Sequence, residues 1–134
     1  MRGFADSTEH LLAEMERIDL LIRACVAGFR AVHTEDAQFR GLYVSEQQVD
    51  AYLAAPLGVP AWLTSDAHRN RELMTRLDDL GQRISQRKQL ALAAGVELRL
   101  DRLQRSFALD DLDIRILLAC LAVELDTRYE KLYA

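Results

Sequence analysis

Apolar side chains recur along the first part of the chain at spacings that predict a helix. Between residues 6 and 33 successive apolar positions lie alternately four and three residues apart. This heptad stripe is typical of a helix that packs lengthwise against another helix. Asp6 or Ser7 is a candidate N-cap, with Glu9 in the first turn. The stripe consists of Leu11, Met15, Ile18, Ile22, Cys25, Phe29 and Val32.

A second apolar stripe predicts a longer helix after residue 64, because no proline follows Pro60. Thr64, Ser65 or Asp66 would cap it, and Gly81 or Gly95 could bend it. The predicted helix is roughly 40 residues long, which is about 60 Å at 1.5 Å per residue. Its apolar positions are Leu73, Leu77, Leu80, Ile84, Ala91, Ala94 and Leu98, joined by a parallel stripe of Leu92, Val96, Leu100, Leu103 and Phe107.

The segment FRGLYVSEQQVDAYL joins the two long helices and predicts a short helix of its own. Ser45 and Gln48 fit a capping box, and the helix should end near Pro56. The following stretch APLGVPAW is a loop, since each proline removes a backbone donor. We expect the apolar side chains of this capping segment, 36–62, to close the open end of the helix pair; they are Phe39, Leu42, Tyr43, Val49, Tyr52, Leu53 and Trp62.

The last segment, residues 109–134, has a different character. It begins with Asp110, Asp111 and Asp113 and continues with a helix that is apolar nearly all round, which predicts burial on every side. Asp126 should cap a further helix that carries Tyr129 and Tyr133. The chain stops within that helix, so we expect the natural protein to continue past Ala134.

Together these elements predict an all-α fold. The expected architecture is a long antiparallel coiled-coil helical hairpin, with a short capping helix and a C-terminal pair of short helices. The hairpin domain would span 1–108, including the capping segment. Residues 109–134 would begin a further helical segment.

Composition agrees with one folded helical chain: it has 134 residues, 50% hydrophobic side chains and only two prolines. The net charge is −4. Residues 1–62 carry 5 basic and 9 acidic side chains, residues 63–108 carry 9 and 6, and residues 109–134 carry 3 and 6. A mildly basic middle between acidic flanks favours contacts within the protein over capture of nucleic acid.

The chain shows no sign of secretion or of a membrane span. Met1 to His10 is polar, and no apolar run reaches the ~20 residues that a spanning helix needs. The two cysteines, Cys25 and Cys120, lie among apolar neighbours, which predicts reduced core residues in a cytoplasmic protein.

The sequence contains few residues arranged for catalysis, cofactor binding or metal binding. The sequence has no G-x-x-x-x-G-K-[ST] loop and no G-x-G-x-x-G. His10 and Glu14 have metal-compatible spacing, but further ligands are missing and we expect both at a solvated helix end. His33 and His68 are expected to be solvated. We therefore predict no catalytic, cofactor-binding or metal residue, and no enzyme activity of this chain alone.

Two stretches resemble the region before the motor module in a group of bacterial AAA-type ATPases that are often encoded near contractile injection system genes. They are FRGLYVSEQQVDAYLAAP and FALDDLDIRILLACLAVELDTRYEKLYA. In that family an N-terminal helical domain is followed by a winged-helix-like segment and then by the ATPase. The most specific part, Leu117 to Ala134, resembles the start of the winged-helix-like segment.

The resemblance implies a role rather than a catalytic site. The nucleotide-binding motifs of the family would lie beyond Ala134, so ATP and Mg would be cofactors of the parent protein. The implied function is an interaction or regulatory domain that contacts a protein partner, the remaining ATPase domains or another copy, with no nucleic acid and no membrane. The alternative is a DNA-binding helix-turn-helix module, of which the terminal helix pair, Asp110 to Tyr133, would form half. Candidate interaction residues are Leu92, Val96, Leu103, Leu117, Leu121, Tyr129 and Tyr133.

Overall fold

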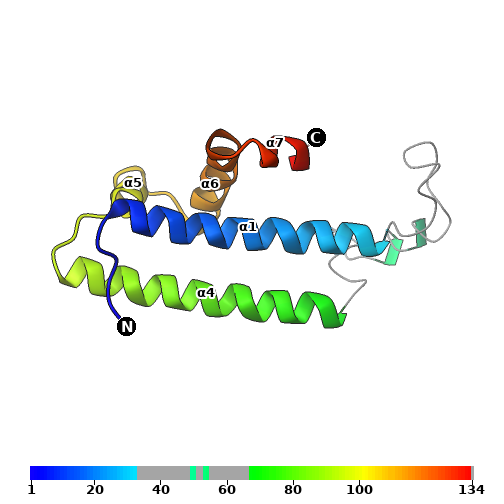
Figure 1. The fold of residues 1–134 in the computed structure, drawn as a ribbon, viewed down its shortest axis with the longest axis horizontal. Coiled ribbons are helices and arrows are strands. Elements are labelled where there is room, and N and C mark those ends of the chain that lie inside the picture. Colours follow the sequence, from blue (N-terminus) through cyan, green and yellow to red (C-terminus); the bar gives the residue numbers. More distant parts are fainter. Residues whose placement is uncertain (33–48, 51–52, 55–66, 134) are drawn as a thin grey trace. The chain divides into compact units, whose positions relative to one another are not determined.

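The computed structural model describes residues 1–32, 49–50, 53–54 and 67–133. Across these ranges every regular element is a helix, which confirms the predicted all-α class. The helices are α1 (Ser7–Val32), α4 (Ala67–Ala93), α5 (Arg99–Phe107), α6 (Asp111–Leu125) and α7 (Arg128–Tyr133), shown in Figure 1.

The chain divides into two compact units. The first comprises Met1–Asp19 and Asp78–Ala134, and the second comprises Leu20–Leu77. Helices on both sides of residue 108 belong to the first unit, and the predicted domain boundary at that residue stays a prediction. The candidate site described below lies wholly within the first unit.

In the first unit the beginning of α1 runs beside the end of α4 in the opposite direction (Figure 1). Glu9 forms an ion pair with Arg87, and about two turns further along α1 Arg17 lies against Gly81. A Cβ atom on Gly81 would lie 3.4 Å from the Arg17 guanidinium carbon. These contacts fit the antiparallel pairing expected from the two stripes, whereas the coiled-coil packing of a full-length hairpin stays a prediction.

Local side-chain bonds explain where α1 begins. Asp6 is its N-cap, because Asp6 Oδ1 accepts a 2.8 Å hydrogen bond from the backbone N–H of Glu9. The side chain of Ser7, in the first turn of α1, binds the start of α5: its Oγ donates to the Glu97 carbonyl at 3.0 Å and accepts from the Arg99 N–H at 2.9 Å. Since Leu98 supplies no side-chain cap, Ser7 satisfies a free N–H at the start of α5.

The predicted helix of roughly 40 residues is wrong in its extent. It is two helices, since α4 ends at Ala93 and α5 begins at Arg99. Gly95 adopts the left-handed conformation, with φ of 78°, and the Val96 N–H bonds the Ala91 carbonyl at 3.0 Å. This is the Schellman arrangement that stops a helix, and Gly95 therefore ends the helix instead of bending it.

Both predicted stripes contribute to the core. Leu80, Ile84 and Ala91 of α4 are buried at the expected spacing, as are Ile18 of α1 and Leu98 before α5. In the second unit Leu77 and Ala24 are buried. The remaining buried apolar residues of the first unit are Phe4, Ile114, Leu118, Ala122 and Tyr129.

Several expectations about burial are wrong. Val49 and Leu53, the described members of the capping segment, are exposed, and Leu53 is 80% exposed. Cys25 is half-buried and free, and burial raises the pKa of its thiol, but Cys120 lies exposed on α6. Phe107, expected in a stripe, is exposed at the end of α5. Some predictions fall outside the residues whose side chains are described. They concern the rest of the capping segment with Ser45 and Gln48, the N-cap candidates 64–66, and the histidines His33 and His68.

Candidate functional site

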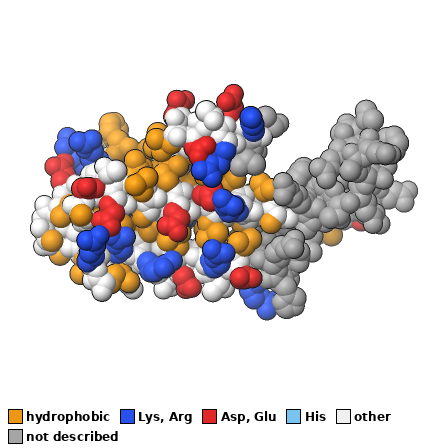
Figure 2. Space-filling view, in the orientation of Figure 1, with side chains coloured by type: hydrophobic (Ala, Val, Ile, Leu, Met, Phe, Trp, Pro, Cys, Tyr) orange, Lys and Arg blue, Asp and Glu red, His pale blue; other side chains and the backbone are white. Residues whose placement is uncertain are grey.

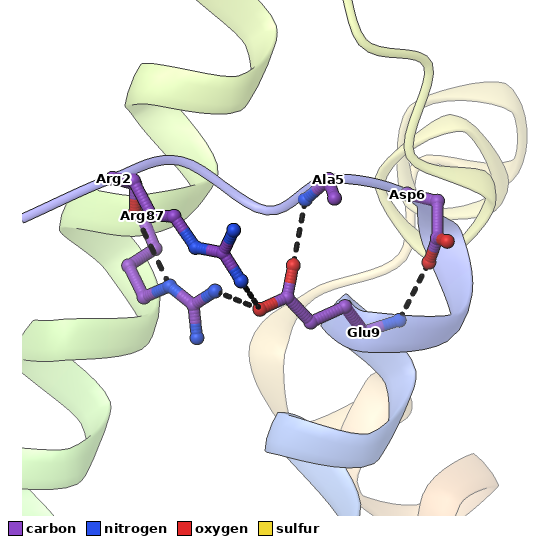
Figure 3. Close-up of polar contacts among 5 residues, drawn as sticks. All are labelled: Arg2, Ala5, Asp6, Glu9 and Arg87. Atoms are coloured by element: carbon purple, nitrogen blue, oxygen red, sulfur yellow. Dashed lines mark hydrogen bonds and ion pairs between the residues drawn. The ribbon is translucent and has the colours of Figure 1, made fainter.

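The N-terminal residues lie across α4 and form a clasp, which consists of Arg2, Phe4, Ala5, Glu9 and Arg87. Figure 3 shows Glu9 at its centre: Oε1 pairs with the guanidinium groups of Arg87 and Arg2, and Oε2 accepts from the Ala5 N–H at 2.7 Å. The Ala5 backbone N–H, and after it the Arg87 guanidinium, lowers the pKa of the Glu9 carboxyl. The Arg87 guanidinium carbon also lies 4.1 Å from the centroid of the Phe4 ring.

The clasp buries His10, which was expected at a solvated end. The ring of His10 is 2% exposed and lies 4.9 Å from the Phe4 ring, centroid to centroid. The heptad pattern gave no sign of this burial, because the six residues before the helix fold back over it. Both ring nitrogens lack a hydrogen-bond partner, and Nε2 lies 3.7 Å from Oε1 of Glu14.

His10 lines a polar cavity of about 50 Å³ between α1, α4, α5 and α6. The buried Asp101 carboxylate forms two ion pairs: Lys88 Nζ lies 3.3 Å from its Oδ1, and Arg105 Nε lies 2.9 Å from its Oδ2. Oδ2 of Asp101 nevertheless has no hydrogen-bond partner. The cavity is thus lined by carboxylates and cations, which include the ion pairs Lys88–Asp101 and Arg17–Glu14. Within the described ranges no three His, Cys, Asp or Glu side chains converge as metal ligands.

The second feature is the pair α5 and α6, which is joined by a three-residue turn at 108–110. Ala108 adopts the left-handed conformation with φ of 52°, and the Leu109 N–H bonds the Gln104 carbonyl at 2.9 Å. Asp110 then caps α6 through a capping box: its Oδ1 accepts from the N–H groups of Leu112 and Asp113, and Asp113 accepts in return from the Asp110 N–H. Helix, short turn and helix are the parts of a helix-turn-helix unit.

The expectation that α6 is buried on every side is wrong. Its buried residues, Ile114, Leu118 and Ala122, recur every four positions and form one face. Several large apolar residues on the rest of the helix are exposed, including Leu112 at 63% and Ile116 at 55%. Figure 2 shows hydrophobic side chains gathered over α5 and α6. We call the exposed apolar side of α6 the outward face; it contains Leu112, Ile116, Leu117 and Cys120.

The seven predicted interaction residues fall in different surroundings. Leu117 lies exposed on α6, Leu92 is exposed near the end of α4, and Val96, Leu103 and Leu121 are half-buried. Tyr129 belongs to the core, because its ring is 7% exposed and its hydroxyl bonds Asp19. The side chain of Tyr133 lies outside those described. Leu112 and Ile116, which sequence reasoning did not single out, are more exposed than Leu117, and the acidic cap of α6 gave the only hint of an outer face.

The helix that presents the outward face carries more acidic than basic side chains. α6 contains one basic residue, Arg115, against Asp111, Asp113 and Glu124. The arginines of α5 are partly neutralised, since Arg102 pairs with Glu97 at 2.7 Å and Arg105 pairs with Asp101. A helix that enters the major groove instead presents Arg, Lys, Asn or Gln to bases and phosphates.

None of the described helices is long and apolar enough to cross a membrane. No curated protein and no solved structure matches the chain. A family model described as "Winged helix domain, variant" matches residues 1–134. This match supports the expected winged-helix-like segment and extends it from the last residues to the whole chain. The chain belongs to the winged helix domain, variant, family, and in it a three-residue turn joins α5 to α6.

Proposed function

We propose that this chain is a non-catalytic protein-interaction domain that binds a protein partner through the outward face of α6. The observation that carries the proposal is the exposure of Leu112 and Ile116 on a helix whose opposite face is already packed in the core. Clustered exposed apolar side chains are characteristic of protein contact surfaces. A regulatory or assembly role then needs no catalytic group in the domain itself.

The resemblance to the AAA-type ATPases supplies the proposed setting. In it the domain precedes a motor that binds ATP and Mg, and the domain recognises a client or helps the motor assemble. A reading frame that continues past codon 134 into a G-x-x-x-x-G-K-[ST] loop supports this setting. A stop codon directly after codon 134 of the natural gene contradicts it.

Site-specific photo-crosslinking in the native cell tests the interaction itself. A photo-reactive residue at position 116 should capture a protein, whereas the same residue at position 12 should not. Leu12 is a matched control because it is 62% exposed on α1 of the same unit. The absence of any protein adduct at position 116 would contradict the proposal.

DNA binding is the second candidate, since winged helix domains commonly bind DNA and α5 and α6 form a helix-turn-helix. The three carboxylates of α6 oppose it, because phosphate contacts supply most non-specific affinity. Fluorescence anisotropy with duplex DNA at about 50 and 200 mM salt separates the candidates. Tight binding that weakens steeply with salt would favour DNA and overturn the protein-interaction proposal.

A further inference from the structure

Leu112 and Ile116 of the outward face begin a second heptad stripe on α6. Leu112, Ile116, Ala119 and Val123 follow one another at spacings of four, three and four. At 100° per residue these four positions fall within an arc of about 60°. Leu112 and Ile116 are exposed, while Ala119 and Val123 are half-buried. The stripe lies on another side of α6 from Ile114, Leu118 and Ala122, and its exposed part consists of Leu112 and Ile116.

The spacing of the stripe indicates which kind of secondary structure in a partner would fit it. Apolar side chains three and four positions apart form a seam along one side of a helix. A second helix that lies along α6 would pack its own side chains between those of the seam. The small side chain of Ala119 in the middle of the stripe would allow the two backbones to approach closely.

The charges beside the stripe indicate which charges the partner helix should carry. Asp113 and Glu124 are exposed and lie eleven positions apart, which is about three helical turns, so they share one side of the stripe. Asp110 and Asp111 add negative charge at the start of the helix, and Arg115 alone opposes them on the other side. A partner with Lys or Arg along its own flank would pair with this acidic edge.

A second copy of this chain fits the same edge poorly. In an antiparallel pair of α6 helices, Asp113 of one copy would face Glu124 of the other. In a parallel pair, the three aspartates at the start of both helices would gather at one end. Either arrangement places like charges together, which destabilises a coiled-coil interface.

We infer that the outward stripe of α6 binds an amphipathic helix of a partner protein, with apolar residues three and four positions apart and basic residues beside them. The inference rests on the proposed protein-interaction function and names the chemistry of the partner. It follows from the stripe spacing and from the acidic edge together.

A pair of synthetic helical peptides tests it directly. Both have leucine at the two core positions of about three heptads; one carries lysine at the flanking positions and the other carries glutamate. Titrated against the full chain by calorimetry at about 0.15 M salt, the lysine peptide should bind at least tenfold more tightly than the glutamate peptide. Equal binding of the two, or binding of neither, would overturn the inference.

Variants locate the binding on the protein. Ile116→Glu should weaken the lysine peptide at least tenfold, and Leu12→Glu, on an equally exposed leucine, should leave it unchanged. Glu124→Gln should weaken it severalfold and flatten its salt dependence, because one carboxylate is removed without touching the stripe. Circular dichroism checks that each variant keeps its helices. An equal loss in the Leu12 variant would overturn the location.

Three further outcomes distinguish failure of this inference from failure of the proposed interaction function. If neither peptide binds but position 116 still captures a protein in cells, the partner chemistry is wrong and the interaction function stands. If position 116 captures nothing, the interaction function itself fails. If sedimentation shows a dimer that Ile116→Glu abolishes, the occupant is a second copy and the inference is overturned.

Discussion

The hydroxyl of Tyr129 on α7 donates a 2.7 Å hydrogen bond to Oδ1 of Asp19 on α1, although the two residues are 110 positions apart in sequence. Burial of the Tyr129 ring, followed by the hydrogen bond to Asp19 and its negative charge, raises the pKa of the phenol to about 12. The bond therefore links α7 to α1 at Asp19, and both residues belong to the first unit.

Replacing Tyr129 with phenylalanine tests the strength of this link. Tyr129→Phe should lower the free energy of unfolding by about 1.5 kcal/mol, because a hydrogen bond to a charged group contributes roughly 1.5 to 3 kcal/mol. Urea denaturation measures the change. A spectroscopic titration provides a second readout, since the variant should lack the tyrosine that ionises near pH 12 in the parent. An unchanged urea midpoint would show that the bond does not stabilise the fold.

The clasp predicts a loss of stability in acid. Because the pKa of Glu9 is lowered in the folded protein, its carboxylate stabilises the fold above the unfolded value near 4.5, and this stabilisation disappears as the pH falls below it. Glu9→Gln should be less stable than the parent at pH 7, and the difference should shrink toward pH 3. Chemical denaturation at several pH values measures it. A difference that does not vary with pH would contradict the role of the charge.

The left-handed turn between α5 and α6 predicts a stabilising substitution. Ala108 has φ of 52°, a conformation that costs an L-residue about 1 to 2 kcal/mol. Ala108→Gly should raise the free energy of unfolding by about 0.5 kcal/mol, since the greater freedom of glycine in the unfolded chain offsets part of the relief. Gly95→Ala is the matched reverse change, because Gly95 has φ of 78°, and it should destabilise by about 1 kcal/mol. Thermal melts of both variants test the pair, and changes of the same sign would contradict it.

The buried ring of His10 predicts an unusual pair of outcomes. His10→Leu should retain the stability of the parent at pH 7, because it replaces two unpartnered ring nitrogens with apolar atoms. His10→Ala should lose about 2 to 4 kcal/mol, since it opens a hole beside Phe4. Denaturant unfolding compares the two. Equal losses in both variants would show that the ring nitrogens make bonds that stabilise the fold.

Much of the fold could be read from residue spacing. Apolar positions three and four apart predicted the helical class, and the burial of Ile18, Leu80, Ile84 and Ala91 follows from those stripes. The caps of α1 and α7 were also predictable, because Asp6 and Asp126 bond backbone N–H groups only two or three residues away. Such short-range bonds depend on local sequence alone.

Tertiary contacts decided the rest. A helix that is apolar all round gives no indication of which side meets the core, so the outward face of α6 is visible only once Ile114 and Leu118 are packed. Three contacts join residues at least 78 positions apart: the Glu9–Arg87 ion pair of the clasp, the bond between Tyr129 and Asp19, and the cap that Ser7 provides for α5. The burial of His10 also needs the N-terminal segment to fold back over α1. The sequence by itself determined where helices form, because that depends on neighbours within a few turns. Which of their faces stay open for a partner was decided by packing between distant segments.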